Sequence, residues 1–211
     1  MFYFVKSSWL MRRLYRNCIW RINTTQKELY LTFDDGPHPL ITGKVLDELK
    51  KYNARATFFC IGKNVVAYPD MYRRIIDEGH AVGNHSFNHL NGWKTKDKIY
   101  LDDIVTAKQY IDSNLFRPPY GRIGFFQLKQ LALPRFNLKT IMWTVLSGDF
   151  DTAITKEKCL ENVLLNAAEG SIIVLHDSEK AAERMLHALT GTLDYFSKKG
   201  YTFNKIEMNL L

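Results

Sequence analysis

Short apolar segments alternate with amphipathic segments from residue 28 to residue 204 of this chain. The segment 171–176, SIIVLH, is a continuous apolar run, which is typical of a strand buried on both faces. Residues 41–52 instead place Ile41, Val45 and Leu49 on one face of a helix. The alternation predicts parallel strands joined by right-handed helical crossovers. We expect seven strands, at 28–33, 56–61, 80–84, 114–117, 137–145, 171–176 and 201–204, and six helices, at 41–52, 70–78, 98–112, 124–133, 156–168 and 181–199.

The positions of polar residues favour one of the two architectures that fit this alternation, an open doubly wound sheet or a closed barrel. Polar side chains fall at or just after the carboxyl ends of the expected strands, namely Asp34, Asp35, His85, Arg117, Asp149 and Asp177. A barrel collects these ends at one mouth, whereas an open sheet spreads them along a line. We therefore expect a distorted (β/α)7 barrel, similar to a TIM barrel, with residues 28–211 as one catalytic domain.

Residues 1–27 mix aromatic side chains with basic ones. The basic residues interrupt the apolar ones, so the segment matches neither a signal peptide nor a transmembrane helix. Aromatic and arginine side chains together are also found in segments that lie on a membrane surface. We favour packing of this N-terminal segment against the domain, through Phe2, Phe4, Trp9, Leu10, Leu14 and Trp20. The corresponding location is the cytoplasm, with peripheral contact to the inner membrane as the alternative.

Charge and cysteine content exclude several other classes of protein. The net charge of +7 would suit an anionic partner, but the basic residues look scattered and no nucleic-acid motif is present. We therefore expect a solvated basic surface and no nucleic-acid partner. Three widely spaced cysteines, Cys18, Cys60 and Cys159, fit neither a disulfide framework nor a CxxC motif, and Cys60 is expected in the core.

Two motifs combine residues that suit a metal site. Asp34 and Asp35 precede Gly36-Pro37 at the end of the first strand, although an acidic turn with this sequence is common without any function. His85 and His89 are four residues apart, so on a helical turn they would face the same metal ion. One carboxylate and two imidazoles suit zinc, with cobalt, nickel or iron as alternatives.

Three further motifs are weak when each is taken alone. Residues 117–121, RPPYG, form a turn stiffened by two prolines; Trp143 and Asp149 flank a loop; and His176 ends a buried strand. Their order along the chain, together with TFDDG at 32–36 and HSFNH at 85–89, resembles the five motifs of the polysaccharide deacetylases, or family-four carbohydrate esterases. The resemblance extends over nearly the whole chain from Leu31 onward.

The resemblance implies a role for each matching residue. It implies Asp34 as the general base, with Arg117 orienting it. It implies His176 as the general acid, with Asp149 tuning its proton affinity. The metal ligands would be Asp35, His85 and His89; the Tyr120 N–H would stabilise an oxyanion; and Tyr120, Trp143 and Leu175 would contact the substrate, with Leu175 lining the pocket of the acetyl methyl group.

The function implied is hydrolysis of the acetyl group of an N-acetylated sugar by metal-activated water. The substrate would be a glycan, oligosaccharide or lipid-linked sugar that contains N-acetylglucosamine. Removal of O-acetyl groups, as by xylan esterases, a non-catalytic sugar-binding barrel, and a purine-pathway amide hydrolase remain alternatives. Leu146 and Phe150 depart from the family pattern, which has aspartate and tryptophan there, so the wall of the substrate groove is expected to differ.

Overall fold

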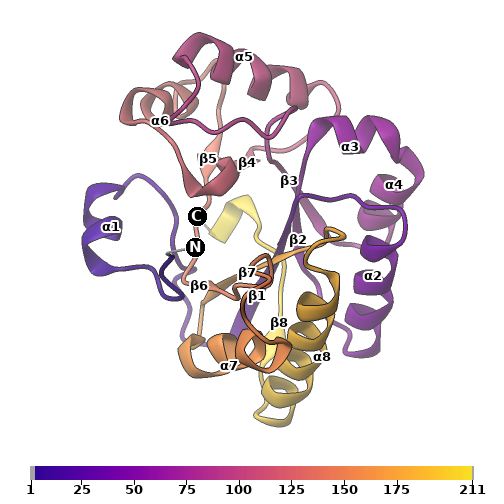
Figure 1. Cartoon of the computed structure of the whole chain (residues 1–211). Helices are drawn as coiled ribbons and strands as arrows, with labels where there is room; N and C mark the ends of the chain where they lie inside the picture. Colours follow the sequence, from indigo (N-terminus) through magenta and orange to yellow (C-terminus); the bar gives the residue numbers. More distant parts are fainter. Residues whose placement is uncertain (1–2, 211) are drawn as a thin grey trace.

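The structure is a computed structural model that describes residues 3–210, and its centre is a curled parallel sheet (Figure 1). Within the described residues the sheet has eight strands, and its main path runs in the order β5-β4-β3-β2-β1-β7-β6, with β8 beside the start of β1. The strands are β1 (Glu28–Asp34), β2 (Thr57–Cys60), β3 (Ala81–Asn84), β4 (Leu115–Phe116), β5 (Lys139–Thr140), β6 (Val145–Leu146), β7 (Ile172–His176) and β8 (Thr202–Phe203). The expected barrel is confirmed, as a half-barrel of parallel strands with helices around it.

Helices surround the sheet as the alternation predicts (Figure 1). They are α1 (Trp9–Leu14), α2 (Ile41–Lys51), α3 (Gly62–Ala67), α4 (Pro69–Asp77), α5 (Asp97–Lys108), α6 (Phe125–Leu131), α7 (Lys156–Asn166) and α8 (Ala182–Lys198), with short 3-10 turns at Pro119–Gly121 and Met208–Leu210. The short helices α1 and α3 were not expected from the sequence.

The expected strand at 137–145 is wrong in one respect, because it is two short strands, β5 and β6. Between them the backbone bonds to other partners. The carbonyl groups of Ile141 and Met142 accept hydrogen bonds from the Arg117 guanidinium, and the Met142 N–H donates to Ile19. Continuous strand pairing is lost here because the backbone binds the buried arginine and the N-terminal segment.

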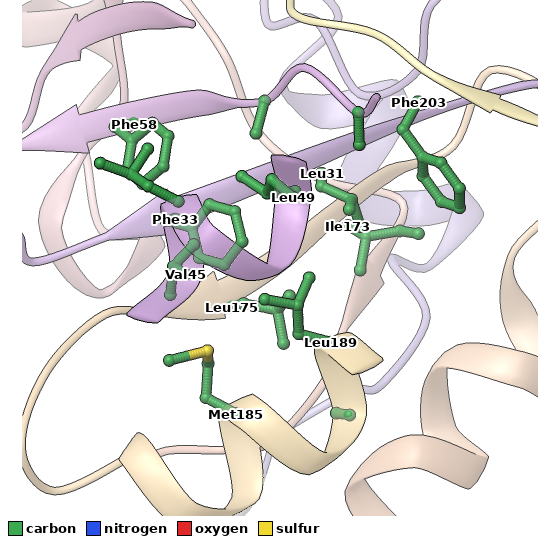
Figure 2. Packing of buried hydrophobic residues seen from close by; sticks show 14 of the residues in the cluster. Leu31, Phe33, Val45, Leu49, Phe58, Ile173, Leu175, Met185, Leu189 and Phe203 are labelled. Atoms are coloured by element: carbon green, nitrogen blue, oxygen red, sulfur yellow. The ribbon is translucent and has the colours of Figure 1, made fainter. Parts of the chain in front are cut away.

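The main core lies between the sheet and helices α2 and α8. Figure 2 shows Leu175 of β7 beside Leu189 of α8, with Phe33 and Val45 close by. All of these side chains are almost completely buried. Cys60 belongs to the same cluster, as expected, and Cys18, Cys60 and Cys159 are all free and buried.

The N-terminal segment forms backbone hydrogen bonds with the open side of the half-barrel. The Ser7 N–H donates to Thr144, and Val5 accepts from the Leu146 N–H. Trp20 is buried, as expected, and Phe2 lies outside the described residues. The expectation of packing is wrong for Trp9, Leu10 and Leu14, because all three side chains are more than half exposed. Within residues 3–210, no helix is both long and apolar enough to cross a membrane.

Candidate active site

The ends of β1 and β3 bring together the three residues expected to bind metal. The candidate ligand atoms of Asp35, His85 and His89 all lie within 4.8 Å of one another. The Oδ1 atom of Asp35 is 3.2 Å from Nε2 of His89 and 3.8 Å from Nε2 of His85. His85 is buried, and its Nδ1 lies 2.8 Å from the carbonyl oxygen of Arg117, which leaves Nε2 to face the aspartate.

Protonation states in this cluster suit a divalent cation. Burial alone would raise the pKa of Asp35, but the close approach of His89 and the charge of His176 hold it below its usual range. Burial lowers the pKa of His85 to about 4, so its imidazole is neutral. Asp35 Oδ1 is buried and accepts no hydrogen bond of good geometry. A buried carboxylate oxygen without a donor, beside imidazole nitrogens of two histidines, fits a metal site.

The two histidines come from a loop rather than from the helical turn that the spacing suggested. Ser86 and His89 have positive φ angles, 60° and 57°, and no helix includes them. The buried carboxylate of Asp103, on α5, accepts hydrogen bonds from the N–H groups of Phe87 and Asn88 and from the Asn88 side chain. Asp103 thereby fixes the loop whose tight turns bring His85 and His89 together.

The Asp34-Asp35 turn is held by residues from three other elements. Asp177, just after β7, accepts hydrogen bonds from the Gly36 N–H and the Thr42 hydroxyl, and Asn64 of α3 donates to the Asp35 carbonyl oxygen. A Cβ at position 36 would lie 2.1 Å from the Asp177 carboxylate, so only glycine fits there. Because Asp35 itself has φ 81°, these contacts stabilise an unfavourable backbone conformation.

Asp34 is separated from this cluster by its bond to an arginine. Nη1 of Arg117 donates to Asp34 Oδ1 at 2.7 Å and also to Thr32. The guanidinium is fully buried and lies 4.1 Å from the centre of the Phe59 ring. Its remaining hydrogen bonds, to Ile141 and Met142, fix its orientation, so the arginine holds Asp34 in one position.

His176 is bound by a second carboxylate. Asp149 is completely buried, and its two oxygens contact the His176 N–H at 2.6 Å and the His176 Nδ1 at 2.7 Å. Phe150 packs edge-on against the His176 ring, with 5.3 Å between ring centres. Because Nδ1 faces Asp149, Nε2 is the ring nitrogen left for proton transfer.

Tyr120 and Trp143 lie on the RPPYG side of the site. The Tyr120 ring is 4.6 Å from that of His89, and its side chain is 57% exposed. Tyr120 has φ 60°, and within the described residues its N–H donates no hydrogen bond. The Trp143 ring packs so closely on Gly121 that a Cβ there would lie 2.4 Å away.

Leu175 does not face this site, which corrects the expectation that it lines an acetyl pocket. It lies in the helix-facing core, against α8 (Figure 2). Side chains alternate along a strand, so the neighbours on the His176 side of β7 are Val174 and Ile172. Val174 is buried and pairs in register with Leu146 of β6. The alternation of side chains along a strand is the sequence signal that places Val174, rather than Leu175, on the side of the active site.

Three comparisons with known proteins identify the family of this chain. The family profile described as polysaccharide deacetylase matches residues 21–130. A peptidoglycan-N-acetylglucosamine deacetylase of Bacillus cereus is 34% identical over 190 residues, which cover 87% of this chain and 88% of the relative. PdaA of Bacillus subtilis, a peptidoglycan-N-acetylmuramic acid deacetylase, is 37% identical over 197 residues, covering 88% of this chain and 72% of the relative. Two other deacetylases are longer, and this chain spans 56% and 39% of their lengths.

The fold comparison extends the same result to three dimensions. The crystal structure of a peptidoglycan N-acetylglucosamine deacetylase superposes with a TM-score of 0.85 and 29% identity, covering 95% of each chain. Fold and site together place the molecule in the class of carbohydrate deacetylases. Within that class, the chain belongs to the polysaccharide deacetylase family, also called the family-four carbohydrate esterases.

Proposed function

We propose that this chain removes the acetyl group from N-acetylated sugars of a peptidoglycan-type glycan, with one divalent metal ion as cofactor. The observation that carries the proposal is that two adjacent carboxylates, those of Asp34 and Asp35, have different partners. Arg117 binds Asp34, whereas Asp35 faces His85 and His89. The relatives named for N-acetylglucosamine and N-acetylmuramic acid deacetylation support an N-acetyl substrate.

Asp35, His85 and His89 would hold the metal ion. Three protein ligands of this type suit zinc best, with cobalt, nickel or iron as alternatives, and they leave further positions for water and substrate. A bound divalent ion would acidify a water molecule and polarise the acetyl carbonyl group.

Asp34 would act as the general base. Asp34 is the sequence neighbour of the expected metal ligand Asp35, but its carboxylate accepts a hydrogen bond from Arg117. This bond uses Oδ1 and orients the carboxylate without occupying both oxygens. Accepting a proton from attacking water requires an oriented carboxylate within hydrogen-bond reach of the water. The fully buried arginine provides that orientation because its other N–H groups are bound to fixed backbone carbonyl groups.

His176 would act as the general acid. Burial alone would lower its pKa, but the charge and hydrogen bond of Asp149, with the charges of Asp35 and Asp34, raise it to about 10. The ring is therefore protonated at neutral pH and has a proton for the leaving amine. The unpaired N–H of Tyr120 would donate to the oxygen that becomes negative when water attacks the carbonyl carbon.

The same site could hydrolyse an O-acetyl ester, so the two reactions must be separated by their products. Only N-deacetylation releases one amine for each acetate. Incubation with N-acetylglucosamine oligomers, a muramic acid-containing glycan and acetylated xylan, with acetate and free amine both measured, tests the assignment. We expect equal amounts of amine and acetate from the first two substrates. Acetate without amine, from xylan alone, would make the chain an O-esterase.

The metal requirement is tested on the same preparation. Dialysis against a strong chelator should abolish activity, and zinc or cobalt should restore it. Full activity in a preparation shown by elemental analysis to contain no metal would refute the role of the Asp35 cluster. Sugar binding without turnover in the metal-loaded protein would instead favour a non-catalytic barrel.

A further inference from the structure

An exposed apolar face on α1 is unexplained by the fold and by the deacetylase site. Trp9 is 71% exposed, and Leu10 and Leu14 are 58% and 56% exposed. Residues 9, 10, 13 and 14 lie on one side of the helix, because they are one turn apart in pairs. We call Trp9, Leu10, Arg13 and Leu14 the α1 face. The Arg13 guanidinium lies 5.5 Å from the Trp9 ring, so charge and apolar surface are adjacent.

The opposite side of α1 fixes the helix to the protein. Ser8 caps its N-terminus by accepting from the Met11 N–H, and Arg12 donates to Ser7. Met11 and Tyr15 pack on a smaller core cluster that includes Tyr100, Phe116 and Leu128, and the Tyr15 hydroxyl donates to the Ile123 carbonyl oxygen. The α1 face is therefore held outward by contacts on the other side of the helix. Figure 1 shows α1 at the periphery of the molecule, between α6 and α7.

Positive charge is concentrated in the N-terminal segment, residues 1–27, which corrects the expectation of scattered basic residues. Residues 1–27 contain six of the 29 basic residues and none of the 22 acidic ones. They therefore account for +6 of the net charge of +7, and the other 184 residues are close to neutral. Arg13 and Arg16 are exposed and lie on or next to the α1 face. The partner of this segment is expected to be anionic.

We propose that the α1 face binds an anionic lipid surface. Exposed tryptophan and leucine side chains insert at the boundary between headgroups and acyl chains, and basic residues beside them are attracted to anionic headgroups. A soluble polyanion would use the arginines but would gain nothing from Trp9, Leu10 and Leu14. The α1 face lies on a single short helix at the edge of the molecule, where a broad lipid surface can reach it. This inference does not depend on the proposed deacetylase activity.

Vesicle binding by the full chain tests the proposal. Co-sedimentation would be measured with phosphatidylglycerol vesicles and with phosphatidylcholine vesicles, and we expect strong binding to the first alone. Replacing Trp9, Leu10 and Leu14 together with serine should weaken binding at least about tenfold. The matched control replaces Leu40 and Leu165 with serine. These leucines lie away from α1 and are 72% and 73% exposed, so this variant should bind like the parent protein.

The charge contribution is tested separately. Arg13→Gln with Arg16→Gln should weaken binding to phosphatidylglycerol by about fivefold per residue, whereas Lys44→Gln with Lys50→Gln on α2 should not. Circular dichroism checks that each variant is folded. The proposal fails if the parent protein does not bind phosphatidylglycerol, if it binds phosphatidylcholine equally well, or if the serine variant retains full binding. Full retention by the serine variant with loss in the arginine variant would indicate a polyanion site instead.

Discussion

Asp149 contacts His176 twice, through the backbone N–H at 2.6 Å and through the ring Nδ1 at 2.7 Å. One buried carboxylate thus fixes both the end of β7 and the imidazole ring of His176. Burial lowers the pKa of His176, but Asp149 reverses the effect and raises it to about 10. The proposed acid is protonated at neutral pH because of this one contact more than any other.

Asp149→Asn should move the alkaline limb of the kcat–pH profile to lower pH. Without the carboxylate charge, burial dominates and the pKa of His176 falls, so the protonated ring is present only in more acidic solution. We expect kcat at neutral pH to fall by about 10²- to 10⁴-fold. Asp151→Asn, two residues further on, is the control and should leave the profile in place. An unchanged profile in Asp149→Asn would show that His176 is not the acid.

His80 should make the fold sensitive to acid. It is buried, its Nδ1 accepts from the Ala56 N–H, and burial lowers its pKa to about 4 from an ordinary value of 6.5. A depressed histidine pKa stabilises the fold fully above about pH 6.5, and this contribution is lost as pH falls toward 4. His80→Asn keeps an acceptor but cannot titrate there, so its free energy of unfolding should drop less between about pH 8 and about pH 5 than that of the parent. An equal drop in both proteins would contradict the assignment; His187→Gln is the control.

Asp103→Asn should weaken metal binding although Asp103 is not a ligand. An amide cannot accept all three of the hydrogen bonds that hold the loop of His85 and His89. We expect metal affinity to fall about 10- to 100-fold, as is usual when residues that orient ligands are lost. The neighbouring Asp102→Asn removes only an exposed pair with Lys98 and should bind metal normally. Equal affinities in the two variants, measured by chelator competition, would contradict this account.

Val174 and Leu175 should respond oppositely to substitution, because they point to opposite sides of β7. Val174→Phe should lower kcat/KM while metal content is retained, since the ring would enter the side of the strand that carries His176. Leu175→Ala should destabilise the fold by about 2–5 kcal/mol, as other large-to-small changes in a core do, with little effect on kcat. Measurement of kcat/KM and of the free energy of unfolding for both variants decides which of the two side chains lines the active site. The reverse pattern would restore Leu175 to the acetyl pocket.

Sequence periodicity predicted the fold well where an element depends on its own pattern. The buried run of β7 and the apolar face of α2 both lie where expected, within a residue or two. The break between β5 and β6 was not predictable, because it depends on Arg117 and Ile19, which are far away in sequence. The short helix α3 carries too few residues for a periodic signal.

For the site, the motifs identified residues but not their geometry. His85 and His89 do converge, yet through positive-φ loop residues rather than a helical turn. Asp103 was missed, although an aspartate beside Ile104 on the buried face of α5 is a detectable signal, since buried carboxylates need partners. Asn64 and Thr42 gave no signal, because their roles depend on contacts with distant turns.

Metal content and kcat of two single variants test the central claim most directly. Asp34→Asn should keep near-normal metal content and lose about 10²- to 10⁴-fold in kcat, because an amide cannot take a proton from water. Asp35→Asn should lose metal, because a neutral amide oxygen is a poorer ligand, and should recover part of its activity at high metal concentration. Asp34→Asn should not recover under the same conditions. If Asp34→Asn loses the metal while Asp35→Asn keeps it, the roles of base and ligand are exchanged and the account of this site is wrong.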